Sequence, residues 1–479
     1  MLTTLLIFVP LVGALVVWAA PLPREATTAL ALLVALAEVG LWIGTLAGFD
    51  FGSGTLQDAA RREWFSDLGV SYHVGFYGFP LWLAGLAVAL GAAAIGYGAW
   101  VGRDRARPYF GLMLFLVGAV VGVFASQDLL VFYVFFEAML IPIYVLVGVW
   151  GGPNRISATI IFVVYTMAGS LLMLASIVAF GLSQGTFSLI ESGTSDNDWI
   201  FLGFAVGFAV KAPLAPFHGW LRAAYTESPP EVAALLSGVV SKAAVFGFVW
   251  IVLRHFPDPV EDWRPLLLVL AAASLVYGSL LAFRQPDVRG VIAYSSMGQM
   301  GLITLGIFAT NDLGLNGAVL HSVSHGLVSG AMFLLTGMLI HRTGTDRFAA
   351  LGGLAKGRPA LATLVITVGM FTLAVPGSSS FAGEFAILAG VFVHGWGYAA
   401  IGATAIVLAA MYTLRLVSAI LHEARGTAVN DGASDLGIAE LAVVVPLVAL
   451  LLTLSVWPAA ISGRSFPGNA ATTVAEAAP

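Results

Sequence analysis

Two of the three lysines in this 479-residue sequence, Lys211 and Lys242, lie inside apolar stretches that are long enough to span a bilayer. The sequence FLGFAVGFAV precedes Lys211, and Lys242 lies between VAALLSGVVS and AAVFGFVW. An ammonium group at that depth costs at least ~2.5–3.5 kcal/mol on insertion scales, so such lysines are rare and usually functional. Loss of hydration disfavours the charged form, and a lysine at that depth can exchange a proton near neutral pH. The two lysines therefore predict a proton or cation pathway through a membrane.

Other ionisable residues also lie in apolar stretches. Glu137 is in VFYVFFEAMLIPIY, His321 and His325 are in GAVLHSVSHGLVSG, and Glu384 is in GEFAIL. The two histidines are four residues apart and share one face of a helix. A neutral imidazole donates at one nitrogen and accepts at the other, which suits a water-filled proton pathway. HxxxH is also a metal-ligand spacing, but the sequence has no cysteine and no other histidine or carboxylate close by, so we expect no metal.

Each of these residues has a structural alternative. Glu137 could hydrogen-bond a neighbouring helix, Lys211 could form a static ion pair, and His321 could be a polar contact between helices. Glu384 follows a predicted helix break, where a carboxylate at a helix N-terminus is favoured, so its alternative is a helix cap. His218, in PFHGWL, could line the inner uptake path or hydrogen-bond a helix end.

The composition predicts an all-α polytopic membrane protein. Hydrophobic residues make up 59% of the sequence, charged residues 10%, and the mean hydropathy is +0.95, outside the range of soluble domains. We expect no strands. The first apolar segment lacks a basic start and a clear cleavage site, so we interpret it as a retained helix. We predict about fourteen transmembrane helices, near residues 2–20, 27–48, 80–101, 109–125, 129–150, 156–182, 198–221, 230–253, 266–283, 290–309, 313–340, 360–394, 398–422 and 438–461.

The distribution of positive charge predicts the orientation, since cytoplasmic loops are rich in lysine and arginine. With the N-terminus outside, the inner loops contain Arg24, Arg103, Arg105, Arg107, Arg155, Arg222, Arg284, Arg289, Arg342, Arg347, Lys356, Arg358 and Arg425. The outer segments then contain only Arg61, Arg62, Arg254, Arg264 and Arg464. The ratio of thirteen to five favours an even number of helices with both termini on the outer side.

Two predicted helices, the seventh and the twelfth, contain helix breakers. The sequence KAPLAPFH at 211–218 contains Pro213 and Pro216, and PGSSSFAGE at 376–384 begins with Pro376. Non-helical backbone at membrane depth is tolerated where it is buried in protein or lines a cavity. Broken helices at corresponding positions of two halves indicate a transporter built from repeats. The breaks are five helices apart, which predicts two inverted five-helix repeats, helices four to eight and nine to thirteen.

Five motifs carry a resemblance to a known family. They are FFEAMLIPIYVLVGVWGG at 135–152, KAPLAPFHGWL at 211–221, FRQPDVRGVIAYSSMGQMG at 283–301, HGLVSGAMFLLTGML at 325–339 and PGSSSFAGEFAIL at 376–388. In this order they resemble the antiporter-like membrane subunits of respiratory complex I, over roughly residues 80–460. The superfamily includes subunits of multisubunit sodium/proton antiporters and of membrane-bound hydrogenases. The glutamate of the GEF motif and the motif at 325–339 resemble subunit M of NADH–quinone oxidoreductase most closely.

The resemblance implies a domain organisation and a function. Residues 1–105 would form three N-terminal helices, residues 106–425 the proton-translocating core, and residues 426–479 the last helix and a tail. The chain would be a translocase subunit of the NADH–quinone oxidoreductase complex in the plasma membrane. Its partners would be other membrane subunits, including neighbouring antiporter-like subunits, and lipid, with no nucleic acid. No phosphate-binding fingerprint occurs, so NADH, flavin, iron–sulfur clusters and quinone would bind partner subunits.

The resemblance also implies roles for the buried residues. Glu137 would be the partner that tunes Lys211, Lys242 the central relay, His325 the next relay and Glu384 the terminal site that exchanges protons with the outer side. Other functions remain alternatives. The chain could be a cation/proton antiporter in which the same lysines gate sodium exchange, or a subunit of a multisubunit sodium/proton antiporter or of a membrane-bound hydrogenase. It could also be a structural membrane spacer.

The sequence departs from the family at two places. Gln299 stands where the SSxxH motif often ends in histidine, and glutamine can order water but cannot carry charge. The loop after the seventh helix reads Arg222-Ala-Ala-Tyr225, without the acid and the histidine that are common there. We interpret Arg284, Asp287 and Arg289 as an inner loop that follows the positive-inside rule, and we expect Asp128 to be solvated at the outer end of the fifth helix.

Overall fold

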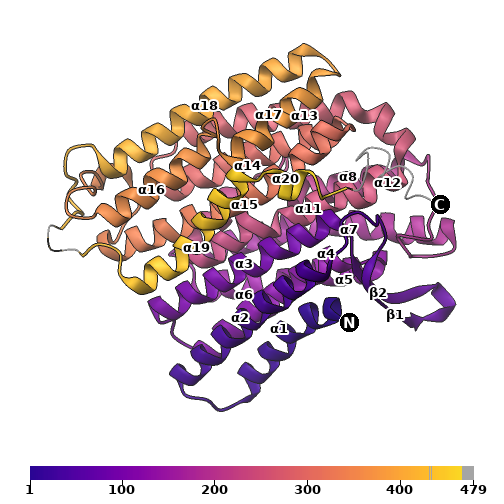
Figure 1. Ribbon diagram of the computed structural model, residues 1–479, viewed down its shortest axis with the longest axis horizontal. Helices are drawn as coiled ribbons and strands as arrows, with labels where there is room; N and C mark the ends of the chain where they lie inside the picture. The colour runs from indigo at the N-terminus through magenta and orange to yellow at the C-terminus, as the bar shows by residue number, and fades with distance from the viewer. Residues whose placement is uncertain (431, 433, 467–479) are drawn as a thin grey trace.

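The computed structural model describes residues 1–430, 432 and 434–466, which form a bundle of long helices lying side by side (Figure 1). Within these residues, twelve helical stretches are long and apolar enough to cross a membrane. They are α1 (Leu2–Ala19), α2 (Arg24–Gly48), α3 (Gly78–Val101), α4 (Ala106–Ala125), α5 with α6 (Leu129–Ala138, Leu140–Trp150), α7 (Arg155–Gln184), Pro230–His255, α13 (Pro257–Phe283), α14 (Val288–Phe308), α15 (Asp312–Thr343), α18 (Trp396–Leu421) and α19 (Ile438–Val456). A short helix, α20 (Ala459–Ser462), follows. The prediction of a helical polytopic membrane protein is confirmed.

The two helices that were predicted to be broken are interrupted at the predicted places. Helix α8 (Asp198–Lys211) ends at the lysine, turns occupy residues 212–220, and α9 (Leu221–Glu227) follows. Helix α16 (Pro359–Thr372) ends before Pro376, and α17 (Ser379–Phe392) begins after it. Proline has no N–H group for the helix ladder and its ring clashes with the preceding turn, which explains both breaks. The count of fourteen crossings and the inverted repeat stay predictions.

The stretch Pro230–His255 contains Lys242, and all its residues after Pro230 are buried. It consists of α10 (Pro230–Leu235), a π-helical segment (Leu236–Val240), α11 (Lys242–Gly247), a second π-helical segment (Phe248–Val252) and α12 (Leu253–His255). The wider π turns rotate the side chains that follow them and are frequent at functional sites. Lys242 lies two residues after the end of the first of these segments.

The prediction that the chain has no strands is wrong. Strands β1 (Gln57–Phe65) and β2 (Val70–Phe76) form an antiparallel hairpin in which Arg62 pairs with Tyr72. Strand β2 is largely buried and carries valines and aromatic residues that favour extended backbone, whereas β1 is largely exposed. The prediction for Asp128 is also wrong. Its side chain is 1% exposed, caps α5 by accepting from the Leu130 N–H, and accepts from the Ser71 N–H of β2 at 3.0 Å.

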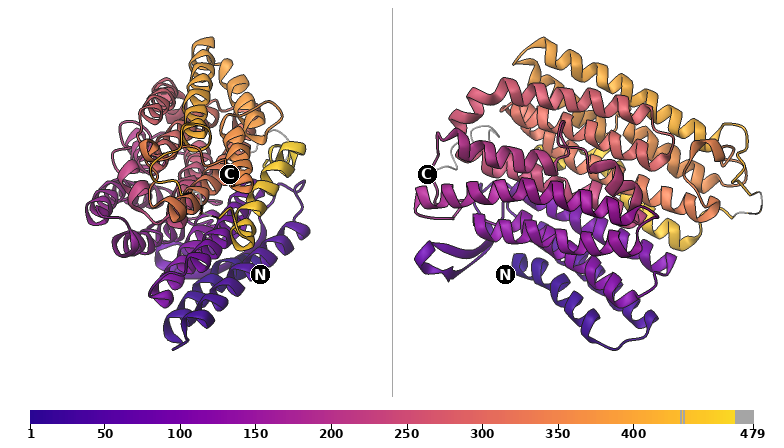
Figure 2. Two further views of the ribbon diagram at one scale, coloured as in Figure 1. Left: turned by 90° about the vertical axis from the view of Figure 1, so that its left-hand side faces the viewer. Right: turned by 180° about the vertical axis from the view of Figure 1, so that it is seen from behind.

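Both described ends of the chain lie at the hairpin end of the bundle (Figures 1 and 2). The N-terminal amine is 3.9 Å from Asp58 at the hairpin, and the Phe466 ring stacks on Phe79 at the start of α3. An even number of crossings requires this arrangement. The opposite end contains arginines that we predicted to be inside, and they pair with carboxylates in Arg103–Glu231, Arg222–Asp287, Arg289–Asp346 and Arg342–Glu440. We refer to this as the arginine-rich end; its location on the inner side of the membrane stays a prediction.

Candidate functional site

Two glycines let Pro230–His255 and α15 approach closely. A Cβ atom on Gly326 would lie 2.6 Å from the carbonyl oxygen of Gly238, and one on Gly238 would lie 3.0 Å from the carbonyl oxygen of Gly326. The two backbones are thus in contact, as small residues permit at crossings of membrane helices. Lys242 is four residues after Gly238, and His325 directly precedes Gly326. The crossing therefore brings the lysine and the histidine together.

Lys242 and His325 are in direct contact. The lysine Nζ lies 2.7 Å from His325 Nδ1 and donates to the carbonyl oxygen of Ser237 at 2.8 Å. The lysine side chain is fully buried, and His325 is 6% exposed. An ammonium donates to a neutral imidazole nitrogen, and transfer of that proton leaves an amine and an imidazolium. The pair can therefore exchange a proton without either residue moving.

A second contact group joins α14, α15 and α17. His321 Nε2 is 2.7 Å from Gln299 Oε1, and Gln299 Nε2 donates to Glu384 Oε1 at 3.3 Å. The direct distance from His321 Nε2 to Glu384 Oε1 is 3.9 Å. Gly383 packs on α15, since a Cβ atom there would lie 3.0 Å from the backbone nitrogen of His321. This close approach positions the next residue, Glu384, beside the histidine.

A cavity of about 30 Å³ connects the two groups. His325, His321, Gln299 and Glu384 all line it. The imidazole centroids of the histidines are 6.4 Å apart. The cavity has room for ~2 water molecules, which is enough to bridge that separation. In the described residues, no group of three or more histidine, aspartate or glutamate side chains could hold a metal ion.

The structure contradicts the alternative that Glu384 caps a helix. The cap of α17 is Ser378, whose side chain accepts from the Phe381 N–H at 3.1 Å. Glu384 lies more than one turn inside the helix and is 2% exposed. Its carboxylate faces the cavity instead of the helix end.

Sequence reasoning missed Tyr412 of α18. This tyrosine is 2% exposed and lines the cavity together with Gln299, Ser295 and Glu384. A hydroxyl at this place can donate to and accept from cavity water. A tyrosine within the long apolar stretch of α18 was the available signal, but aromatic residues are common in membrane helices.

Glu137 and Lys211 lie close together but form no hydrogen bond. They interact electrostatically between α5 and α8, yet neither Lys211 Nζ nor Glu137 Oε1 has a hydrogen-bond partner in the described residues. The ammonium instead lies 4.7 Å from the centre of the Phe136 ring, a cation–π distance. The described residues therefore contain no hydrogen-bonded ion pair between Lys211 and Glu137, and a static pairing of the two charges stays an untested alternative.

His218 is separate from the cavity. It lies on the segment between α8 and α9, half-buried, and its ring packs edge-on against Tyr277 of α13 with centroids 5.3 Å apart. Its Nδ1 atom is buried and has no hydrogen-bond partner in the described part of the chain. The structure thus places His218 beside the helix break, toward the arginine-rich end.

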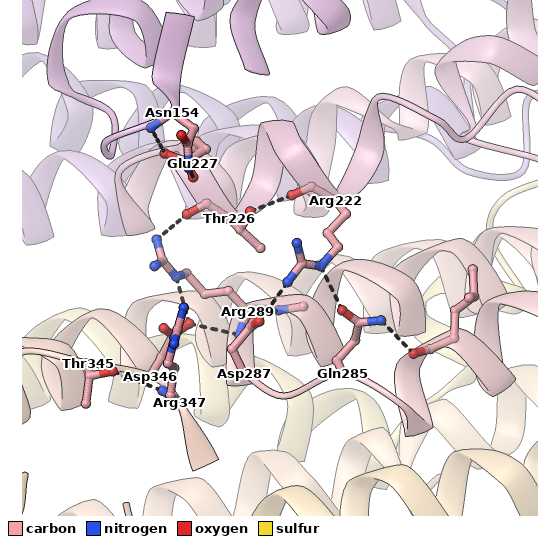
Figure 3. Close-up of polar contacts among 12 residues, drawn as sticks. Asn154, Arg222, Thr226, Glu227, Gln285, Asp287, Arg289, Thr345, Asp346 and Arg347 are labelled. Carbon is pink, nitrogen blue, oxygen red and sulfur yellow. Dashed lines mark hydrogen bonds and ion pairs between the residues drawn. The ribbon is translucent and has the colours of Figure 1, made fainter. Parts of the chain in front are cut away.

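The altered loop residues join a polar network at the arginine-rich end (Figure 3). Arg222 of α9 donates to Gln285 at 2.7 Å and to Asp287 at 2.8 Å. Arg289 lies between Asp346, at 2.8 Å, and the carbonyl oxygen of Thr226. Figure 3 shows these contacts tying α9 to the segments before α14 and after α15. The arginine at 222 thus has a structural partner where the family's usual loop acid is missing.

Comparison with known proteins gives one family. The family model described as "NADH:quinone oxidoreductase/Mrp antiporter, TM" matches residues 126–411. The chain is 35% identical over 447 residues to NADH-quinone oxidoreductase subunit M of Rhodobacter capsulatus, covering 89% of this chain and 86% of that protein. It is 34% identical over 500 residues to the protein of the same name from Mycobacterium tuberculosis (strain ATCC 25618 / H37Rv), covering 94% and 90%.

Solved structures agree. A chain of respiratory complex I from Thermus thermophilus with bound NADH superimposes with a TM-score of 0.91 at 31% identity, and the match covers 100% of both chains. A chain of the Mrp complex from Dietzia sp. DQ12-45-1b gives a TM-score of 0.88 at 21% identity, covering 98% of this chain and 97% of that one, which shows a shared fold.

Proposed function

This chain belongs to the NADH:quinone oxidoreductase/Mrp antiporter family of membrane proteins, and on that premise we propose that it is a proton-translocating membrane subunit of an NADH–quinone oxidoreductase. The observation that carries the proposal is the buried series of Lys242, His325, the water-sized cavity, His321 and Glu384. Ionisable groups at membrane depth are costly, and such a series is the arrangement that a proton pathway needs. A structural spacer would have no use for it.

The proposed pathway starts at the arginine-rich end, on the inner side of the membrane. Protons load onto Lys211 or Lys242, pass from Lys242 to His325, cross the cavity to His321, and leave through Glu384 to the outer side. Approach and withdrawal of Glu137 shifts the proton affinity of Lys211, because a nearby carboxylate favours the ammonium form. The close but unbonded arrangement of these two residues supports this switch.

We propose that the redox chemistry takes place on partner subunits. The chain has no cysteine and therefore offers no thiolate ligand for an iron–sulfur cluster. NADH, flavin, the clusters and quinone would bind elsewhere in a plasma-membrane complex, and neighbouring antiporter-like subunits would flank this chain. The proposed core, residues 106–425, contains the family match at 126–411.

The test uses the purified complex in sealed vesicles with a pH-sensitive dye. We expect addition of NADH and a quinone to form a proton gradient whether or not sodium is present, and His325→Gln to reduce the protons moved per NADH oxidised. His394→Gln is the matched control, since His394 bonds the carbonyl oxygen of Ala309 and lies outside the cavity lining. Sodium-dependent exchange that needs no NADH would favour the antiporter alternative. Parental pumping by His325→Gln would contradict the proposed pathway.

A further inference from the structure

Three buried serines bond one another across helices. Ser237 Oγ lies 2.8 Å from Ser296 Oγ of α14 and is also hydrogen-bonded to Ser329 Oγ of α15. All three side chains are at most 4% exposed. Either oxygen of each contact can be the donor. Tyr225 of α9, also fully buried, adds a fourth hydroxyl within interaction range of Ser237.

These contacts differ from those of most buried serines in the bundle. Ser279 donates to the carbonyl oxygen of Leu275 in its own helix, and Ser322 does the same to Ala318. Such a bond satisfies a hydroxyl within one helix and needs no neighbour. The hydroxyls of Ser237 and Ser329 instead face each other between helices. They form a polar connection through an otherwise apolar interior.

The connection runs from the arginine-rich end toward the cavity. Tyr225 is followed by Thr226, whose carbonyl oxygen belongs to the network of Figure 3. Ser237 is seven residues from Pro230, which begins its helix, so it lies about 10 Å into the bundle at 1.5 Å per residue. Ser329 lines the cavity one turn after His325, and the carbonyl oxygen of Ser237 accepts from Lys242.

We propose that Tyr225, Ser237 and Ser329 form a hydroxyl relay that delivers protons from the arginine-rich end of the bundle to the cavity beside Lys242 and His325. The relay rests on the proposed function and specifies its uptake side. Ser296 bonds the same oxygen of Ser237 and holds it in place between the other two hydroxyls.

The relay conserves atoms and charge. Each hydroxyl accepts one hydrogen from the preceding group while it donates its own to the next, so one proton taken up at Tyr225 appears as one proton released from Ser329. Every oxygen ends with the single hydrogen that it had before. Rotation of the hydroxyls then restores the starting orientation, and the undetermined donor direction of both serine contacts is compatible with either state.

Variants that remove single hydroxyls test the relay in the assembled complex. We expect Ser237→Ala and Tyr225→Phe to slow NADH-driven pumping by roughly five- to tenfold, the rate change equivalent to ~1–1.4 kcal/mol in the transfer step. Ser237→Thr keeps the hydroxyl and should restore most of the rate. The slowed variants should also show a larger solvent deuterium isotope effect, which a purely structural defect would not produce. Ser279→Ala is the control, because it removes one buried serine hydroxyl that bonds only within its own helix.

A parallel Lys242→Met variant distinguishes failure of the hydroxyl relay from failure of the proposed function. If Lys242→Met stops pumping while Ser237→Ala and Tyr225→Phe pump at the parental rate, the relay is wrong and the proposed function stands. If Lys242→Met also pumps normally, the proposed function fails. An equal loss in Ser279→Ala would show that any buried serine is needed for packing, and this too would overturn the relay.

Discussion

Replacing Lys242 by methionine removes the ionisable group of this side chain but keeps most of its volume. Methionine is unbranched and adaptable, and it fills the space between Ser237 and His325 without an ionisable group. We expect the complex to assemble and its NADH-driven pumping to fall by at least ~100-fold, the lower range for loss of a proton-transfer group. Lys242→Arg should not restore pumping, because the guanidinium stays protonated at all relevant pH values.

The structural cost of this substitution is small. Lys242 makes two short hydrogen bonds, 2.8 Å to the carbonyl oxygen of Ser237 and 2.7 Å to His325 Nδ1. Hydrogen bonds between membrane helices contribute ~0.6 kcal/mol on average and at most ~1.7, so losing both costs about 1–3 kcal/mol. Removing an ammonium group from membrane depth gains at least ~2.5–3.5 kcal/mol. The variant should therefore be as stable as the parent, and lost pumping cannot come from unfolding.

Two measurements on the same preparation check this reasoning. Thermal unfolding of the detergent-solubilised complex should give a transition within a few degrees of the parent, and dye-loaded vesicles should report the missing proton gradient. Parental pumping by Lys242→Met at equal complex content would refute the role of the lysine as central relay. A large loss of thermal stability would refute the energetic argument instead.

Four further predictions concern other charged residues. Glu384→Asp should pump better than Glu384→Gln, since aspartate still ionises, and equal pumping by Glu384→Gln and the parent would remove this residue from the pathway. Glu137→Gln should assemble and lose activity, whereas failure to assemble would favour a structural carboxylate. Glu231→Ala should lower the free energy of unfolding by ~3–5 kcal/mol in thermal or chemical unfolding, because it leaves the part-buried guanidinium of Arg103 without its bidentate partner. A decrease below ~1 kcal/mol, as for exposed ion pairs, would contradict this prediction. Partial burial opposes ionisation of Asp435, in the loop before α19, but three backbone N–H groups and a nearby arginine outweigh it and lower the pKa of this carboxyl. Its stabilising contribution is thus fully present above about pH 4 and declines as the pH falls through the lowered pKa. Asp435→Asn should therefore lower the melting temperature at pH 7, and this effect should shrink steadily on acidification below about pH 4; an effect that does not change with pH would disprove the assignment.

Hydropathy predicted most of the fold because a bilayer constrains sequence strongly. A crossing helix needs about twenty apolar residues, and the twelve continuous stretches satisfy this locally. The breaks beside Pro213 and Pro376 followed from the missing N–H group of proline. The hairpin was missed because β1 is exposed and polar, so its sequence lacks the alternation that would have predicted a strand.

The members of the site could be predicted from the sequence, but their contacts could not. A buried lysine or histidine is conspicuous in an apolar stretch, whereas its neighbours depend on how helices cross. The contact of Lys242 with His325 depends on Gly238 and Gly326, two of many glycines in this chain. Asp128 looked solvated because its partner, the Ser71 N–H, belongs to the hairpin that was not predicted.

On the proposed pathway, Gln299 determines how a proton would pass between His321 and Glu384. Its amide accepts from one side and donates to the other but never gains a charge, so it cannot carry the proton itself. His321 Nε2 bonds Gln299 at 2.7 Å, and the carboxylate is 3.9 Å away, beyond hydrogen-bond distance. Transfer therefore needs either cavity water at the second imidazole nitrogen, which has no hydrogen-bond partner in the described residues, or release of the glutamine. A histidine at position 299 would provide a titratable step that the glutamine does not, so on the proposed pathway the last transfer would depend on the order of cavity water or on rotation of the Gln299 side chain.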